Sequence, residues 1–227
     1  MIRTFLIAGQ MIMILIDGLS YDIIDDHRQK SNAVEEIRPE SVQLEVPFIA
    51  QAPFGDWSPP FDEACEEASI IMVKFFLDNQ KISKEIAENE IVNFVGWQTE
   101  QGYSVDIRSD QMAEVSKNYY NINAQTFFGD NVSIAKIEQF IADGSPVILP
   151  VAGRMLGNPY YTGEGPPYHV LVVTGYDQEN FVTNDPGTRR GESFSYDKDL
   201  LYNSIHDWTG AKETIESGRK AMLILKN

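Results

Sequence analysis

A chain of 227 residues with 43% apolar and 11% aromatic side chains has the composition of a packed globular protein, which excludes a mainly disordered one. Its 34 acidic and 18 basic residues give a formal net charge of −16, which repels phosphate backbones and anionic lipid headgroups at long range. We therefore expect no nucleic-acid partner. The single cysteine excludes an intramolecular disulfide and leaves the redox compartment open.

Residues 1–40 are expected to form an N-terminal segment outside the main domain. Arg3 precedes a mostly apolar run over 5–16 that resembles the core of a short signal peptide, with Gly18 and Ser20 at a conceivable cleavage point. About 12 residues are too few to span a bilayer as a helix. The segment 1–20 therefore indicates either export or membrane association, or an N-terminal stretch packed on the domain. The charged residues that follow are typical of a linker, which leaves 41–227 as the domain.

Residues 62–77 contain the only cysteine and predict a helix. We expect Asp62 to cap its first turn, where Glu66 and Glu67 also favour the positive end of the helix dipole. Cys65 lies beside the buried face of this helix. It is either a small buried hydrophobe or a thiol that needs a cationic partner to offset the two glutamates. The buried face consists of Ala64, Ala68, Ile71, Met72, Phe75 and Phe76.

Helices are predicted before strands in the rest of the chain. An alternating strand over 42–46 is followed by a loop rich in proline and glycine over 52–60. Ser83 is expected to cap the next helix, and Gly144 is expected to stop the last one. The further helices are predicted over 83–95, 109–120 and 133–143. The later strands are predicted over 147–151, 169–174, 180–183 and 221–225. This order indicates an α+β domain.

His169 opens a strongly apolar strand and follows a long loop of Gly, Pro and Tyr over 152–168. The turn between 174 and 180 is expected to fold the next strand back antiparallel, which brings Asp185 close to the level of His169. A thiol nucleophile needs an imidazole that takes its proton and returns it to the leaving amine, and the imidazole needs an acceptor on its other nitrogen. Cys65, His169 and Asp185 supply these parts. The Cys65 backbone N–H and the Gln51 amide are candidate oxyanion donors.

Each of these residues also has a structural interpretation. His169 alone fits a core histidine, and Asp185 followed by Pro-Gly fits a turn. The aromatic residues Tyr160, Tyr161 and Trp57 either pack or line an apolar substrate cleft. No metal site is predicted, because His169 and Asp185 lack a second His or Cys at ligand spacing. What favours catalysis is that Cys65 at a helix start is followed by His169 and Asp185 on consecutive strands.

Four segments carry a resemblance to a known family: Val-Pro-Phe-Ile-Ala-Gln at 46–51, Ala-Cys-Glu-Glu-Ala-Ser at 64–69, Tyr-His-Val-Leu-Val-Val-Thr-Gly-Tyr at 168–176 and Asn-Asp-Pro-Gly at 184–187. The chain resembles the papain-like cysteine peptidases, in particular the bacterial group related to the double-glycine leader peptidases that process bacteriocins. The resemblance implies that Cys65 is the nucleophile, His169 the general base and acid, Asp185 its orienter and Gln51 an oxyanion donor. It also implies that a helical half with the Cys65 helix packs on an antiparallel sheet.

Two features depart from the family pattern. Glu66 follows Cys65 where many relatives have Gly. The separation of Gln51 and Cys65, 65 − 51 = 14 residues, exceeds the usual spacing, so the loop 52–60 must bulge outward if Gln51 reaches the site.

The resemblance thus predicts a papain-like cysteine peptidase that hydrolyses peptide bonds in a peptide or protein substrate through an acyl-enzyme thioester, without a metal or organic cofactor. The alternatives are a Cys-dependent acyltransferase with the same triad and a non-catalytic peptide-binding domain of the same fold. A surplus of acid around the cleft would favour basic or neutral substrates, but net charge does not locate that acid. Oligomeric state and compartment stay open.

Overall fold

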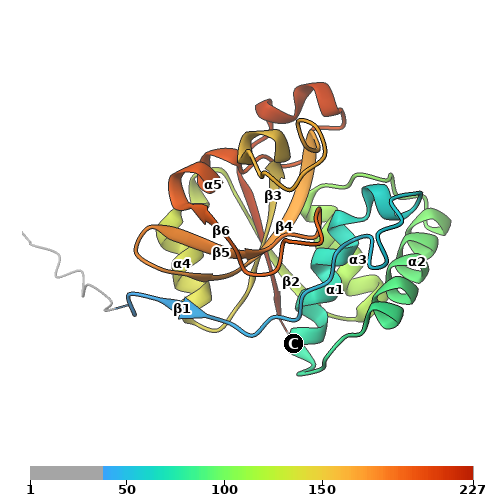
Figure 1. The fold of residues 1–227 in the computed structure, drawn as a ribbon, viewed down its shortest axis with the longest axis horizontal. Coiled ribbons are helices and arrows are strands. Elements are labelled where there is room, and N and C mark those ends of the chain that lie inside the picture. The colour runs from blue at the N-terminus through green and yellow to red at the C-terminus, as the bar shows by residue number, and fades with distance from the viewer. Residues whose placement is uncertain (1–37, 227) are drawn as a thin grey trace, which may run out of the picture. The chain divides into compact units, whose positions relative to one another are not determined.

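The computed structural model describes residues 38–226, which form the α+β arrangement of Figure 1. Residues 1–20, with their signal-like run, lie outside the described residues. Within 38–226, no helix combines the length and the apolar character that a membrane span requires. The elements in chain order are β1 (Val42–Gln43), α1 (Cys65–Leu77), α2 (Lys84–Glu100), α3 (Ser109–Tyr120), β2 (Asn123–Phe128), α4 (Ile134–Ala142), β3 (Val147–Ala152), β4 (Tyr168–Tyr176), β5 (Asn180–Asn184), β6 (Phe194–Asp197), α5 (Lys198–Ser204) and β7 (Ala221–Lys226).

The strands form one antiparallel sheet in the order β2-β7-β3-β4-β5-β6, with β1 added to β4. In the β3–β4 pair Val147 lies opposite Val173 and Val151 lies opposite His169. In the β4–β5 pair Val172 lies opposite Asn184, so β5 runs back toward the start of β4 as expected. The residue after β5 is Asp185, which therefore emerges at the end of the sheet where His169 begins its strand.

Helices cover both faces of the sheet, as Figure 1 shows with α1, α2 and α3 on one side and α4 and α5 on the other. Strand residues alternate between two buried clusters because neighbouring side chains point to opposite faces. One cluster packs under α1 to α3 and includes Ile148, Val170, Val172, Leu223 and Leu225. The other packs under α4 and α5 and includes Val147, Leu149, Leu171, Val173 and Ile224. Because helices cover both faces of the sheet, every residue of β3 and β4 is buried, and most of them are apolar.

Three helices begin at or next to their predicted first residues, although α2 extends to Glu100, beyond the predicted end at 95. α3 spans the predicted residues 109–120. The Ser83 side chain accepts a hydrogen bond from the Ile86 N–H at the start of α2, at 3.3 Å. Ser133 does the same for Lys136 in α4, and Gly144 follows that helix with a φ of +82°, a left-handed conformation that glycine adopts without strain.

Two local predictions are wrong. Asp62 does not cap the cysteine helix, because residues Phe61–Glu63 form a separate 3₁₀ turn and Ala64, with ψ of 34°, interrupts the helical backbone. Cys65 is thus the first residue of α1. The strand expected over 42–46 pairs only at Val42 and Gln43, since the chain then leaves the sheet toward the cleft.

Truncation of Ile148 tests the doubly covered sheet. Its side chain is fully buried, and the residue lies opposite Val172 and Leu223 at the centre of the sheet. We expect Ile148→Ala to lower the free energy of unfolding by about 2–5 kcal/mol, from lost burial and the cavity left behind. Urea unfolding measures this value. The matched control Ile86→Ala removes a side chain that is 45% exposed and should change stability by about 0.5 kcal/mol or less. Similar losses in both variants would contradict the assigned core.

Candidate active site

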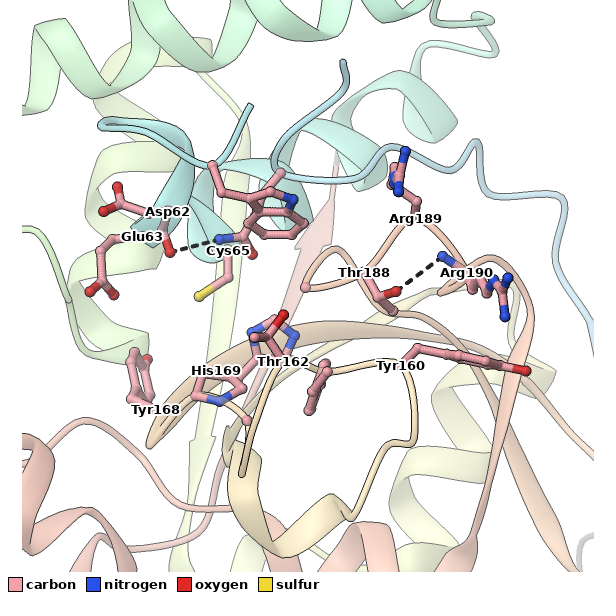
Figure 2. A pocket seen from close by; sticks show the side chains of 16 residues that line it. Asp62, Glu63, Cys65, Tyr160, Thr162, Tyr168, His169, Thr188, Arg189 and Arg190 are labelled. Atoms are coloured by element: carbon pink, nitrogen blue, oxygen red, sulfur yellow. Dashed lines mark hydrogen bonds between the residues drawn. The ribbon is translucent and has the colours of Figure 1, made fainter. Parts of the chain in front are cut away.

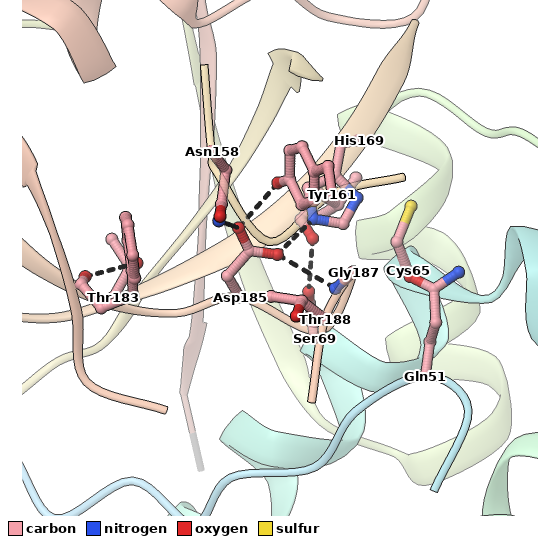
Figure 3. Close-up of polar contacts among 12 residues, drawn as sticks. Gln51, Cys65, Ser69, Asn158, Tyr161, His169, Thr183, Asp185, Gly187 and Thr188 are labelled. Atoms are coloured by element: carbon pink, nitrogen blue, oxygen red, sulfur yellow. Dashed lines mark hydrogen bonds and ion pairs between the residues drawn. The ribbon is translucent and has the colours of Figure 1, made fainter. Parts of the chain in front are cut away.

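α1 and β4 place Cys65 and His169 against one cleft. The Ser69 hydroxyl of α1 donates a hydrogen bond to the Val170 carbonyl of β4 at 3.2 Å, which joins the two elements close to both residues. Cys65 and His169 line the same cleft, which has a volume of about 850 Å³. Figure 3 shows the Cys65 sulfur and the His169 ring turned toward each other across this space. The thiol and the imidazole are therefore brought together, although 104 residues separate them (169 − 65 = 104).

His169 is held by Asp185 in the interior of the protein. The Nε2 atom of His169 lies 2.7 Å from Oδ1 of Asp185, and the side chains are 2% and 0% exposed. The same oxygen accepts a hydrogen bond from the Gly187 N–H at 3.0 Å. This contact leaves Nδ1 as the ring nitrogen available on the side of Cys65.

Asp185 Oδ2 has three further donors that the sequence did not suggest. They are Tyr161 Oη at 2.6 Å, Tyr196 Oη at 2.7 Å and Asn158 Nδ2 at 3.2 Å. Burial alone would raise the pKa of Asp185, but the charge of His169 and these hydrogen bonds outweigh it and hold the pKa below its ordinary value. Burial and the nearby carboxylate raise the pKa of Tyr161 well above its ordinary value, so its phenol remains a donor.

Gly187 is required for this packing. A Cβ atom at this position would lie 2.8 Å from Cε1 and 3.0 Å from Nε2 of His169, which is closer than ordinary contacts allow. The Pro-Gly turn after Asp185 therefore makes room for the imidazole.

Cys65 lies in an acidic environment. Its sulfur is 3.0 Å from Oε2 of Glu66, and Glu66 Oε1 accepts a hydrogen bond from the Ile107 N–H at 3.1 Å. Burial raises the pKa of the Cys65 thiol well above its ordinary value, and the charges of Glu66, Glu67 and Asp106 act in the same direction. The thiol hydrogen bond goes to Glu66 rather than to the imidazole. Burial and this contact therefore favour the neutral thiol over the thiolate.

The two glutamates that follow Cys65 are themselves buried. Burial, and then the charge of Glu67, raises the pKa of Glu66 well above its ordinary value. Burial likewise raises the pKa of Glu67 to about 7, although the hydrogen bond donated by Gln98 opposes this shift. The second oxygen of Glu67 is buried without a hydrogen-bond partner in the described residues. Both side chains thus favour the protonated form, which has no charge to desolvate.

Gln51 also lines the cleft, but both hydrogens of its amide are already used. The side-chain Nε2 of Gln51 donates to the carbonyls of Phe61 and Asp62 at 3.0 and 3.1 Å. The backbone N–H of Gln51 donates to the Pro186 carbonyl at 3.0 Å. These bonds close the base of the loop 52–60 and tie it to the turn after Asp185. Gln51 therefore reaches the site, and an oxyanion would have to replace one of the two carbonyl acceptors.

The cleft rim carries aromatic and charged side chains. Trp57, Tyr160 and Tyr161 line it, and Trp57 and Tyr160 are 42% and 43% exposed. Figure 2 shows Asp62 and Glu63 on one side of Cys65 and Arg189 and Arg190 on the other. Within residues 38–226, no three His, Cys, Asp or Glu side chains form a group suited to a metal ion.

The packing of a helix that begins with a cysteine against an antiparallel sheet, in which a histidine is the second residue of β4, defines a papain-like cysteine peptidase fold. The model of the Peptidase_C39 like family matches residues 43–215, and the chain belongs to this family. The resemblance inferred from the sequence is thereby confirmed.

A solved structure of similar fold agrees, and a second match has lower similarity. A C39-like peptidase from Bacillus anthracis matches with a TM-score of 0.53 and 18% identity, over 83% of this chain and 99% of that chain. Xylellain, a cysteine protease from Xylella fastidiosa, matches with a TM-score of 0.39 and 14% identity, over 84% of this chain and 87% of that chain. No curated protein matches the chain.

The raised pKa of Glu67 predicts a pH dependence of stability. The pKa is about 7 in the folded protein and near 4.5 in the unfolded chain, so the folded state binds more protons between these values. The stability of the wild-type protein should therefore fall as pH rises through this window, and Glu67→Gln should remove about 1–3 kcal/mol of that fall. Urea unfolding at pH 5 and pH 8 measures both slopes. The exposed control Glu100→Gln should keep the wild-type slope, and an unchanged slope in Glu67→Gln would refute the assignment.

Proposed function

We propose that the protein is a cysteine peptidase in which Cys65 attacks the scissile carbonyl, His169 transfers the proton and Asp185 orients His169. The observation that carries this proposal is the shared cleft of Cys65 and His169, with Nε2 of His169 committed to Asp185 at 2.7 Å. Membership of the C39-like family supports peptide or protein substrates.

The acidic environment of Cys65 determines the order of the chemical steps. Because the thiol is neutral at rest, His169 acts as a general base that removes the proton as sulfur attacks. The resulting imidazolium is stabilised by Asp185 and donates the proton to the departing amine, which leaves a thioester on Cys65. His169 then deprotonates water, which attacks the thioester, and the proton returns to the sulfur as the acid product leaves.

The oxyanion formed in each attack needs donors near the reacting carbon. Cys65 is the first residue of α1, where the helix gives its backbone N–H no intrahelical partner. The Gln51 amide lies in the same cleft and is the second donor in this proposal, once it exchanges a carbonyl of Phe61 or Asp62 for the oxyanion.

Thiol labelling and peptide hydrolysis together test the triad. Cys65→Ala should abolish hydrolysis of a peptide mixture, and mass spectrometry of the products measures this hydrolysis. We expect His169→Ala to slow the alkylation of Cys65 by iodoacetamide at pH 7 about tenfold or more, because the proton acceptor is lost. The wild-type rate should continue to rise on the alkaline side of neutrality, since a raised thiol pKa delays ionisation.

Other outcomes separate the alternatives. Hydrolysis by the Cys65→Ala variant would contradict the proposal. Products joined to an added amine in place of water would indicate an acyltransferase with the same triad. Equal labelling of wild type and His169→Ala, without hydrolysis, would indicate a non-catalytic binding domain.

Gln51→Ala tests the oxyanion donor separately from the nucleophile. We expect kcat to fall about 100-fold with little change in KM, because this donor acts on charge that develops in the transition state. The rate of Cys65 alkylation should stay within about twofold of wild type, since alkylation forms no oxyanion. A parallel loss of alkylation would instead mean that Gln51 only supports the loop 52–60.

A further inference from the structure

Arg189 and Arg190 are the two arginines of the cleft, and they form no ion pair with any residue of 38–226. Both are exposed and both line the cleft that contains Cys65 and His169. Within residues 38–226, neither has a carboxylate partner. The other arginines of this range, Arg38, Arg108, Arg154 and Arg219, each form an ion pair. In a chain with 34 acidic and 18 basic residues, two consecutive arginines that lack a carboxylate partner within 38–226 are unexpected.

The loop that carries these arginines is fixed by the catalytic geometry. Asp185 N–H donates to the Gly191 carbonyl at 2.9 Å, and Gly191 N–H donates to the Thr188 carbonyl at 3.3 Å. A Cβ atom at Gly191 would lie only 1.8 Å from the Asp185 carbonyl oxygen, so the loop closes tightly on itself. The arginines are therefore presented by the same closed turn that places Asp185 against His169.

Aromatic and backbone contacts direct the two side chains. The Arg190 guanidinium lies 4.9 Å from the centre of the Tyr160 ring, which in turn packs edge-on against Phe194. The Arg189 guanidinium lies beside Gly55 of the loop 52–60. These neighbours restrict the guanidinium groups but offer no negative charge. An anion that enters the cleft would supply the negative charge that these neighbours lack.

We infer that Arg189 and Arg190 form a carboxylate-binding subsite that selects peptides with an acidic group at this end of the cleft. The inference rests on the proposed peptidase function and names a substrate class for it. A guanidinium pair binds a carboxylate through charge-assisted and often bidentate hydrogen bonds, whereas an amide of equal shape gains much less. The carboxylate is either an Asp or Glu side chain or the α-carboxylate of a chain end.

Three peptide sets distinguish these sources. The first carries one Glu, moved through the positions of an amidated peptide, the second carries Gln at the same positions, and the third is the Gln set with a free C-terminus. We expect wild-type protein to cleave the best Glu peptide or the free-carboxylate peptide about tenfold faster, in kcat/KM, than its amide counterpart. This ratio should decrease at 0.5 M NaCl, because the pair is exposed to solvent.

Substitutions assign the effect to the arginines. The double variant Arg189→Gln/Arg190→Gln should bring the ratio close to one and keep cleavage of neutral peptides within about twofold. Arg189→Glu/Arg190→Glu should reverse the preference toward peptides with Lys at the same position. The control Arg38→Gln removes one positive charge outside the cleft lining, and it should keep the wild-type ratio.

A binding measurement separates failure of this inference from failure of the peptidase proposal. Fluorescence anisotropy of labelled Glu and Gln peptides on Cys65→Ala protein requires no catalysis and should give the same tenfold preference. Preferential binding without any hydrolysis by wild type would refute the peptidase and keep the subsite. Equal affinity for Glu and Gln peptides at every position, or a preference that survives in the double Gln variant, would overturn the subsite.

Discussion

The buried contact between His169 and Asp185 is the interaction on which the rest of the site depends. A carboxylate withdrawn from water loses several kcal/mol of hydration, and this loss is offset only when its oxygens are fully hydrogen-bonded. Asp185 meets this condition with five donors, which come from β4, the turn at Gly187, β6 and the loop between β3 and β4. The ends of two strands and two long connections are thereby fixed around one side chain. That rigidity is what sets the orientation of the imidazole.

The two halves of the site have opposite electrostatics. On the sheet side, hydrogen bonds and the neighbouring imidazole hold Asp185 ionised. On the helix side, burial favours the protonated forms of Cys65, Glu66 and Glu67. Glu66 is also structural, because it accepts a hydrogen bond from the Ile107 N–H just before α3. Burial of the thiol thus outweighs the helix N-terminus, which would otherwise stabilise a thiolate, and His169 removes the proton during attack.

The sequence predicted what depends on local pattern. Ser83 and Ser133 marked helix starts because a capping hydroxyl acts within three residues. The strands β2 and β6 and the short helix α5 were not predicted, since their mixed polar sequences show no clear period, and β2 forms only by pairing with the distant strand β7. Tyr161 and Tyr196 were missed as partners of Asp185, because only the folded loop after β3 and the paired strand β6 bring them to it. Gly187 gave the local signal for a turn at this site, because it lies two residues after Asp185 in an Asp-Pro-Gly sequence.

Net charge and cleft charge lead to different conclusions about substrate. A net charge of −16 indicates that the protein as a whole repels acidic peptides as they approach. At physiological salt the Debye length is about 8 Å, so groups inside the cleft respond mainly to their nearest charges. The charged side chains of the cleft are separated by sign, with Asp62 and Glu63 on one side of Cys65 and Arg189 and Arg190 on the other. Added salt would therefore ease the approach of an acidic peptide and weaken its contact with Arg189 and Arg190. Selectivity in this cleft follows from the local pair, which composition alone cannot locate.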